Sequence, residues 1–393
     1  MSDKIRIGLL WHSARSPNLG VGALTHGNIA LAERAAARCG LKPEFVVMAM
    51  DDSSERYPVG ADIEESPINR RTMLARNGLG AAIDGVDCVL DIGGGDSFAD
   101  IYGLKRFIFM TWSKRMVTGR RVPLLLSPQT IGPFDRPAYR FAAARVMRGA
   151  WAIVARDPTS HQLAGKMAPG VRQLSAVDVA FALPYVRQRH SPASVRHIGL
   201  NISGLLFSGG YTGSNQFGLD IDYREFCIQL AKHFSSQPDV RLHLVPHVQG
   251  GAWERDDDLP AIKTLAAMLP DGVATPQFAS PSEAKSYISG LDLLIGARMH
   301  ACIAAFSSGV AVLPVSYSRK FSGLFGGTLG YDHGIPVKGM TTDQALAYAI
   351  GAAGRIDDLR RDVALGNARV EQALDAYVDL LAEFFAEAAG HRK

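Results

Sequence analysis

Cysteine is scarce in this sequence, and closely spaced cysteine pairs are missing. The four cysteines lie far apart, with no CxxC pair among the 393 residues: Cys39, Cys88, Cys227 and Cys302. Zinc and redox motifs need closely spaced pairs, so their absence argues against a zinc site of that kind. Isolated cysteines in mostly apolar surroundings are typical of free thiols in a reducing compartment, and we therefore expect a cytoplasmic protein.

Long apolar runs and a strong net charge are also missing. No stretch approaches the roughly twenty apolar residues that a membrane span needs, and the start MSDKIRIGLLWHS lacks the pattern of a signal peptide. The net charge of +4 is small for this length, which argues against a dedicated nucleic-acid-binding protein. We expect no transmembrane segment, while peripheral association with the inner face of the membrane stays open.

The composition indicates an α/β enzyme in two parts. Hydrophobic residues make up 47% of the chain and charged residues 20%, with 40 glycines, and 393 residues are too many for one compact core. Short apolar runs alternate with helical patterns, which predicts parallel sheets. The expected strands are 5–10, 45–50, 88–92, 122–126, 151–155, 197–202, 242–245, 291–295 and 310–315.

A polar, proline-containing stretch at 185–196 predicts the linker. We expect two α/β domains, 1–190 and 191–393. The last helix has an apolar face that can pack on the body of the protein, on the first half or on a partner. Its members are Val370, Leu374, Tyr377, Val378, Leu381, Phe384 and Phe385.

The chemistry is expected where two neighbouring strands end. Arg298 and His300 follow the strand 291–295, at the start of a helix over 301–308, and Lys320 follows the strand 310–315. Open α/β sheets bind ligands at the carboxyl ends of their strands, where free amide groups and helix starts favour anions. An Arg-x-His at a strand end is also common as a purely structural pair, so the anion pocket is one of two interpretations.

Glycine-rich turns follow two strands of the first half. Asn18, Gly20 and Gly22 follow the first strand, but their spacing is not GxGxxG and does not predict a dinucleotide site. Gly93, Gly94, Gly95 and Asp96 follow the strand 88–92, where amide groups and a carboxylate can contact an anion or a sugar hydroxyl. Asp96 as the cap of a helix is an equally good interpretation.

Three more polar positions lie at predicted strand ends: Arg156, Asn201 and His247. The loops 51–71 and 203–220 have the length and polarity of binding loops. Asp256, Asp257 and Asp258 form a triplet that we interpret as an exposed helix start rather than a metal site.

The motifs together resemble the polysaccharide pyruvyl transferase family. They run in the family's order along nearly the whole chain: DIGGGDSF, SPQTIGPF, ARDPTS, AVDVAFAL, NIS, LVPHV, GARMH and VSYSRK. The resemblance implies two Rossmann-like halves facing across a cleft, as in GT-B glycosyltransferases. The half 1–190 would form the acceptor side and part of the donor site, and the half 191–393 would form the donor site. One position departs from the family, because Val21 stands where its early turn often has Asp.

The resemblance also implies an activity. Enzymes of this family transfer the enolpyruvyl unit of phosphoenolpyruvate to two hydroxyls of a sugar, forming a pyruvate ketal and releasing phosphate, without a metal or other cofactor. The family's functional positions correspond to Arg156, Arg298, His300 and Lys320. Three cations suit a donor that carries a carboxylate and a phosphate.

Histidine changes charge near neutral pH, so His300 is the candidate for acid–base catalysis. A helix start favours the neutral imidazole and a bound phosphate the charged one, and the sequence leaves both open. We assign Asn18, Gly94, Gly95, Asp96, Asn201 and His247 to acceptor binding or to loops around it.

Two other functions fit the same pattern. One is a GT-B glycosyltransferase with a nucleotide-sugar donor, and the other is a non-catalytic protein that binds a sugar or an anion. The acceptor sugar, its attachment to a lipid and the oligomeric state have no readable signal in the sequence.

Overall fold

The computed structural model describes residues 4–50, 56–57, 63–191, 194–250 and 254–390. The chain forms two compact units, and each is described by itself. The first unit comprises Met1–Arg15, Leu24–Ala182 and Glu371–Lys393, and the second comprises Ser16–Ala23 and Leu183–Val370. The short segment Ser16–Ala23 therefore belongs to the second unit, although the chain on both sides of it belongs to the first.

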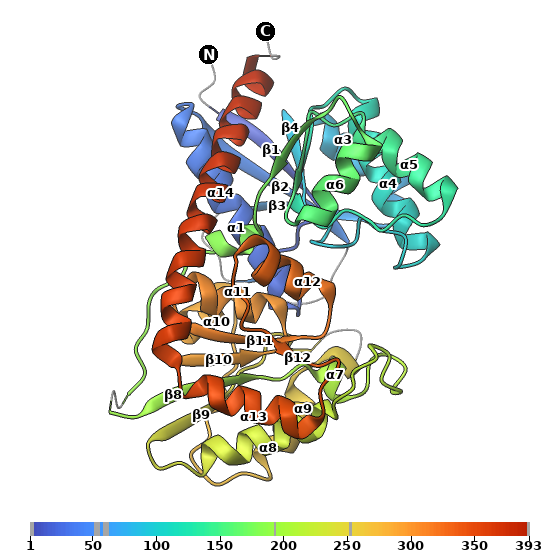
Figure 1. The fold of residues 1–393 in the computed structure, drawn as a ribbon. Helices are drawn as coiled ribbons and strands as arrows, with labels where there is room; N and C mark the ends of the chain where they lie inside the picture. Colours follow the sequence, from blue (N-terminus) through green and yellow to red (C-terminus); the bar gives the residue numbers. More distant parts are fainter. Residues whose placement is uncertain (1–3, 51–55, 58–62, 192–193, 251–253, 391–393) are drawn as a thin grey trace. The chain divides into compact units, whose positions relative to one another are not determined.

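The first unit is built on a seven-stranded sheet in the order β3-β2-β1-β4-β5-β6-β7 (Figure 1). Every neighbouring pair of strands is parallel. Parallel strands need crossover connections, and several of these carry helices that cover the sheet. The strands are β1 (Lys4–Leu10), β2 (Lys42–Met50), β3 (Ile63–Ile68), β4 (Cys88–Asp91), β5 (Leu124–Gln129), β6 (Ala152–Ala155) and β7 (Arg172–Ser175). The helices are α1 (Leu19–Arg38), α2 (Arg70–Leu74), α3 (Leu79–Asp84), α4 (Leu104–Gly119), α5 (Pro137–Met147) and α6 (Pro158–Met167), followed by a 3₁₀ turn at Val179–Ala182.

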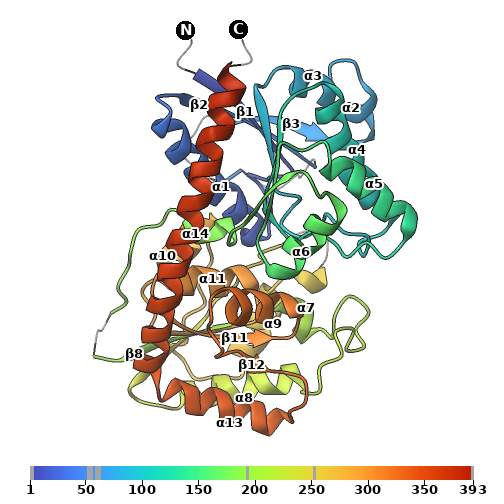
Figure 2. The same cartoon turned by 45° about the horizontal axis from the view of Figure 1, so that its top comes forward.

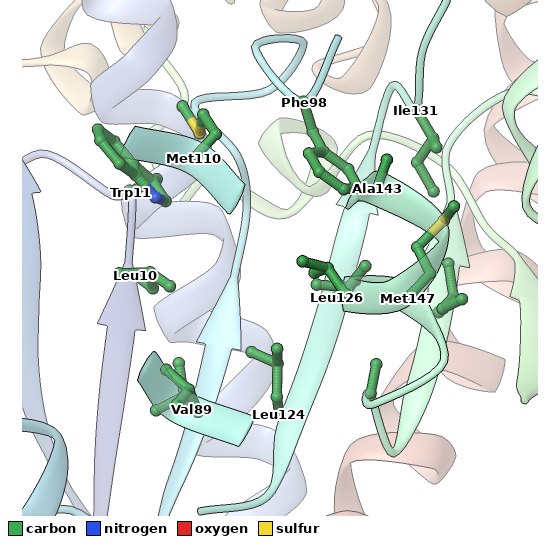
Figure 3. Close-up of a cluster of buried hydrophobic side chains, with 14 of the residues drawn as sticks. Leu10, Trp11, Val89, Phe98, Met110, Leu124, Leu126, Ile131, Ala143 and Met147 are labelled. Atoms are coloured by element: carbon green, nitrogen blue, oxygen red, sulfur yellow. The ribbon is translucent and has the colours of Figure 1, made fainter. Parts of the chain in front are cut away.

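Apolar side chains from strands and helices form the core of this unit. Figure 3 shows Leu10 of β1, Val89 of β4 and Leu126 of β5 beside Met110 of α4 and Met147 of α5. All five side chains are fully buried. This core fixes the positions of β1, β4 and β5, whose carboxyl ends carry the glycine-rich turn and its neighbours.

The second unit is built on a five-stranded parallel sheet in the order β12-β11-β10-β8-β9. Its strands are β8 (Arg196–Asn201), β9 (Val240–Leu244), β10 (Leu293–Gly296), β11 (Ala311–Ser316) and β12 (Ile335–Pro336). Its helices are α7 (Gly204–Phe207), α8 (Tyr223–Ser235), α9 (Leu259–Ala266), α10 (Pro281–Ile288), α11 (Met299–Ser307), α12 (Arg319–Phe321), α13 (Thr342–Ala353) and the first part of α14 (Ile356–Gly390), with a 3₁₀ turn at Glu254–Asp256 and a π-helical turn at Ser322–Thr328. Two parallel, helix-covered sheets confirm the predicted Rossmann-like halves.

The apolar face predicted for the last helix is buried along its whole length. From Glu371 onward α14 belongs to the first unit, where Phe384 packs against Trp151 with ring centroids 5.0 Å apart. The Tyr377 hydroxyl lies 3.0 Å from Asn28 and 2.9 Å from Ser127. Among the helices of the described chain, α14 included, none combines the length and apolar character that spanning a bilayer requires.

The sequence missed three strands, and all three lie at sheet edges. β3, β7 and β12 end the two sheets, where a strand needs little apolar surface. β3 falls within the stretch 51–71 that we predicted to be a loop, and it contains Pro67, which an edge strand tolerates. Of that stretch, 51–55 and 58–62 lie outside the described residues.

The predicted turn at Asn18, Gly20 and Gly22 is shorter in the structure. Helix α1 begins at Leu19, so both glycines lie in its first turns. The Asn18 side chain accepts a hydrogen bond from the Gly20 amide at 3.0 Å, which satisfies a free donor at the helix start.

Candidate functional site

The order of the strands reverses in the second unit between β8 and β10. β9 lies on one side of β8, whereas β10 and the strands after it lie on the other. The carboxyl ends of strands at such a switch point form a natural ligand site in open α/β sheets. Here Asn201 ends β8, while Arg298 and His300 follow β10.

Asn201 links the ends of three strands. Its Oδ1 accepts a hydrogen bond from the Arg298 amide at 2.8 Å, and its Nδ2 donates to the Val245 carbonyl, just beyond β9, at 2.8 Å. The side chain is buried. Asn201 therefore holds the start of α11 against the strands on the other side of the switch point.

Arg298 is surrounded by acidic groups. Its Nη1 donates to Asp256 Oδ1 at 2.8 Å, and its Nε and Nη2 donate to Asp258 Oδ1 at 3.1 and 2.7 Å. Nη2 also reaches the Asp256 carbonyl at 2.5 Å. Burial opposes the charge, but the two carboxylates outweigh it and raise the pKa of the guanidinium above its usual range. These contacts use four of the five N–H groups of Arg298.

Asp258 is the centre of this arrangement. Besides Arg298, it accepts hydrogen bonds from the amides of Gly204, His247 and Val248, each at 2.9 Å. The residue has no solvent exposure, so the expectation of an exposed helix start is wrong for it. A polar triplet before a helix is usually solvated, and only the fold could show that Asp258 points inward.

His300 lies in the first turn of α11, beside the start of α1. A Cβ atom added at Gly20 would lie 2.2 Å from His300 Nδ1, so only glycine leaves room for the imidazole. The segment with Asn18 is held there by main-chain bonds, from Leu19 to the His247 carbonyl at 3.0 Å and from Gln249 to the Pro17 carbonyl at 3.0 Å. Asn18, His247 and His300 therefore belong to one cluster.

His247 is the most unusual member of this cluster. The residue is 3% exposed, and neither ring nitrogen has a hydrogen-bond partner among the described residues. Burial, and then the charges of His300 and Arg298, lower its pKa well below the ordinary value. A neutral buried imidazole with unused donor and acceptor capacity can hydrogen-bond to a ligand.

Lys320 follows β11, the strand next to β10, in the short helix α12. Beside it, a cavity of about 390 Å³ opens between the end of β11 and β12. It is lined partly by Tyr317, Phe321 and Tyr331. The second unit thus carries Asn18, Asn201, His247, Arg298, His300 and Lys320 of the predicted site.

The first unit carries the glycine-rich turn, which follows β4. Gly93, Gly94 and Gly95 have φ values of 56°, 60° and 88°, a region that favours glycine. Asp96 does not cap a helix, because α4 begins at Leu104, and its Oδ2 instead accepts a hydrogen bond from Tyr102 at 2.9 Å. The interpretation of Asp96 as a helix cap is therefore wrong, whereas contact of this turn with a ligand stays a prediction.

Arg156 lies next to this turn. Its Nη1 contacts Asp178 Oδ2 at 2.5 Å and its Nε donates to Thr130 at 3.0 Å. A Cβ atom at Gly95 would lie 3.5 Å from Arg156 Nη1. Arg156, Gly95 and their neighbours Gly94 and Asp96 therefore form a second cluster, within the first unit.

A buried ion pair next to the turn has no signal in the sequence. Lys114 Nζ lies 3.0 Å from Asp91 Oδ1, and both side chains are fully buried. Gln129 donates to Asp91 Oδ2 at 3.1 Å and lies against Gly93, where a Cβ would be 2.2 Å from Gln129 Oε1. Burial lowers the pKa of Lys114, whereas the charge of Asp91 opposes that shift. Lys114, Asp91 and Gln129 therefore support the glycine-rich turn from the buried side.

Within the described residues, no three His, Cys, Asp or Glu side chains are arranged to bind a metal ion. All four cysteines are free thiols, as the sequence predicts.

Solved structures with the same fold are distant in sequence. A UDP-N-acetylglucosamine 2-epimerase homologue from Listeria monocytogenes is 14% identical, covers 97% of this chain and 94% of its own, and has a TM-score of 0.57. HepE from Anabaena, solved with UDP-glucose, is 13% identical, covers 98% of this chain and 100% of its own, and has a TM-score of 0.52. MnaA from S. aureus, solved with UDP, is 13% identical, covers 98% of this chain and 94% of its own, and has a TM-score of 0.56. These similarities confirm the GT-B-like fold class.

No curated protein matches the sequence. The sequence profile of the polysaccharide pyruvyl transferase family matches residues 26–319. This range includes every member of the two clusters except Asn18, and Gly20 and Lys320 also lie outside it. The predicted resemblance is thereby confirmed, and the chain belongs to the polysaccharide pyruvyl transferase family.

Proposed function

We propose that the protein transfers the enolpyruvyl unit of phosphoenolpyruvate to two hydroxyls of one sugar residue, forming a cyclic pyruvate ketal and releasing phosphate. The observation that carries this proposal is the position of His300. Its imidazole lies in the first turn of α11, at the switch point of the second sheet and beside the buried ring of His247. A proton donor is thereby combined with a helix start, where free amides and the helix dipole favour an anion.

In this proposal, the donor's negative charges are bound by Arg156, Arg298 and Lys320. Arg298 and Arg156 both pair with carboxylates, so each contributes only part of its charge to the donor. Arg298 contributes its remaining Nη1 N–H to the donor and orients the start of α11. Among the described residues, Arg156 Nη2 has no hydrogen-bond partner, so we assign this group to the carboxylate or the phosphate.

The chemistry needs one proton and two hydroxyls. His300 protonates the methylene carbon of phosphoenolpyruvate, which becomes a methyl group, and the neighbouring carbon gains oxocarbenium character. The first sugar hydroxyl adds to that carbon and loses its proton. The bond to the phosphate oxygen then breaks, and the second hydroxyl adds to the same carbon and loses its proton, which closes the ketal ring. Fixed cations stabilise the charge on the departing phosphate.

His247 and Asp96 are the best candidates for contacts with the acceptor. His247 has unused hydrogen-bonding capacity, and Asp96 offers a partly exposed carboxylate after a glycine-rich turn. Asn201 uses both side-chain groups internally and therefore supports the site rather than binding the sugar. The loop 203–220 contains α7 and a series of glycine turns, which suits a segment that shapes the acceptor pocket.

The test is incubation of the purified protein with phosphoenolpyruvate and a panel of hexose and N-acetylhexosamine acceptors. We expect release of inorganic phosphate together with a product whose mass has increased by that of a pyruvate ketal. Phosphate release without that product, or no reaction with any acceptor, contradicts the proposal.

A nucleotide-sugar glycosyltransferase is the second candidate, because HepE and MnaA with the same fold were solved with UDP-glucose and UDP. It predicts tight UDP binding and sugar transfer from a nucleotide donor, with no use of phosphoenolpyruvate. A non-catalytic sugar-binding protein would bind the acceptor without any turnover. Calorimetry with UDP and with phosphoenolpyruvate, beside the assay above, separates the three functions.

A further inference from the structure

The first unit exposes an unusual number of large apolar side chains on and around α4. Among the described residues, twelve large hydrophobic side chains are exposed, and half of them lie between residues 101 and 141. They are Ile101, Tyr102, Leu104, Ile108, Trp112 and Phe141, each at least 42% exposed. Single exposed apolar residues are ordinary, but a concentration of this kind marks a surface that contacts something else.

Three of these side chains form one stripe. Leu104, Ile108 and Trp112 are spaced four residues apart in α4 and therefore lie on the same face of the helix. The opposite face of α4 packs into the core through Phe107, Met110 and Val117. Because α4 already buries one face in the core, the stripe is a second apolar face of the helix, exposed on the surface.

The same region is strongly basic. Residues 101–150 contain one acidic residue, Asp135, and ten basic ones: Lys105, Arg106, Lys114, Arg115, Arg120, Arg121, Arg136, Arg140, Arg145 and Arg148. This segment alone has nine more basic than acidic residues, whereas the whole chain has four more. The rest of the chain is therefore acidic on balance, and the basic character is concentrated here.

The charged side chains border the apolar stripe. Lys105 and Arg115 are exposed on α4 itself. Helix α5 lies beside α4 (Figures 1 and 2) and exposes Arg140 and Arg145 next to Phe141. We propose that the exposed face of α4 and α5 is a docking surface for an anionic lipid bilayer.

A bilayer suits this surface better than a nucleic acid does. Leu104 and Ile108 are aliphatic and have no stacking surface for a base, whereas the acyl boundary of a membrane accommodates both. Tryptophan and tyrosine prefer the headgroup region, where Trp112 and Tyr102 would lie. Arginines beside the stripe would contact lipid phosphates.

The surface adjoins the predicted acceptor loop. The hydroxyl of Tyr102 contacts Asp96 Oδ2 at 2.9 Å, and Arg106, in the first turn of α4, donates to Ser97 at 2.8 Å. A sugar carried on a lipid would thus reach the glycine-rich turn directly from the membrane surface. Bilayer binding itself does not depend on phosphoenolpyruvate as donor, so the two proposals fail independently.

The test is sedimentation of the full-length protein with vesicles. We expect binding to phosphatidylcholine vesicles that contain phosphatidylglycerol, weaker binding to phosphatidylcholine alone, and loss of binding as the salt concentration rises. The double variants Ile108→Glu/Trp112→Glu and Arg140→Glu/Arg145→Glu should each reduce binding by about tenfold or more.

Matched changes elsewhere serve as controls. Leu365→Glu introduces the same charge at an exposed apolar site of α14, and Lys232→Glu/Lys263→Glu reverses two exposed charges of the second unit. These controls should bind as the unmodified protein does. The proposal is overturned if the unmodified protein does not bind vesicles. It is also overturned if the variants of α4 and α5 bind as well as the control variants, or if the control variants lose as much binding as they do.

A second measurement does not depend on the folding of the charge variants. Brominated lipids quench tryptophan fluorescence within the bilayer, so quenching should occur in the unmodified protein and largely disappear in Trp112→Phe. Quenching that Trp112→Phe leaves unchanged overturns the proposed orientation. Competition of vesicle binding by single-stranded RNA at low concentration would instead identify a nucleic-acid surface and overturn the lipid assignment.

Discussion

Asp258 accepts hydrogen bonds from both Nε and Nη2 of Arg298, at 3.1 and 2.7 Å, from a position without solvent exposure. The same carboxylate binds the amides of His247 and Val248, so one side chain connects the loop after β9 with the start of α11. The two candidate histidines, His247 and His300, therefore depend on one buried acid for their relative placement.

We expect Asp258→Asn to destabilise the second unit. The amide can no longer neutralise Arg298, and breaking a buried ion pair of this kind costs about 3–5 kcal/mol. Urea unfolding followed by circular dichroism measures the change. Asp257→Asn is the matched control, because Asp257 accepts only the Leu259 amide in the contacts described and should lose much less stability. Equal stability losses in the two variants would contradict a central role for Asp258.

Gly20→Ala tests the space reserved for His300. The added methyl group would lie 2.2 Å from His300 Nδ1, so the imidazole must move. Displacement of a reacting group by about 1 Å can cost on the order of a hundredfold in rate, and we expect a fall of that size in kcat. Gly351→Ala, in the last turn of α13 with no atom within 4 Å of the new Cβ, should leave kcat unchanged and add about 0.5 kcal/mol of stability. A Gly20→Ala enzyme with normal kcat would show that His300 can shift without consequence.

Kinetics should separate the proposed proton donor from the proposed donor-binding cations. His300→Asn removes the acid but keeps polarity, so kcat should fall by about a hundredfold to ten-thousandfold while the KM for phosphoenolpyruvate changes little. Lys320→Ala removes a charge that binds the ground state, and it should raise that KM. Steady-state rates of phosphate release measure both effects. If His300→Asn altered KM and Lys320→Ala altered only kcat, the assignment of His300 as proton donor and Lys320 as donor-binding cation would be wrong.

Stability of the first unit should fall in acid because of His12. Burial, and then the nearby His26 charge, lower the pKa of His12 to about 3 from an ordinary 6.5, although a hydrogen bond to Leu10 opposes the shift. Between these two pKa values, His12 is protonated in the unfolded chain and neutral in the folded chain. Its contribution to the free energy of unfolding is therefore fully present above about pH 6.5 and is lost as the pH falls toward about 3. Each pH unit in that window costs about 1.4 kcal/mol per histidine.

The measurement is the free energy of unfolding at about pH 7.5 and about pH 5. His12→Asn should lower stability at both pH values but lose about 2 kcal/mol less than the unmodified protein between them. Identical pH dependence in the two proteins would mean that His12 titrates normally in the folded state.

Much of the fold was predictable because buried parallel strands have a simple signature. Central strands such as β1, β4 and β10 are mostly apolar runs, and their predicted positions agree with the structure within a few residues. Edge strands can lack that signature, and β3 was therefore missed, although the edge strand β9 was predicted at 242–245. The buried Lys114–Asp91 pair was equally invisible, because each residue looks like an ordinary surface charge until the fold brings them 3.0 Å apart.

The sequence by itself determined the family, the alternation of strands and helices, and the residue types at the strand ends, because apolar periodicity and short motifs are local properties of the chain. Only the tertiary structure decided how those residues are used. It paired Arg298 with Asp256 and Asp258, placed Gly20 against His300, left His247 buried without a partner among the described residues, and gathered an apolar stripe with arginines on α4 and α5. The relations of Arg298, Gly20 and His247 join segments far apart in the chain, and their strength depends on burial, which no local pattern encodes.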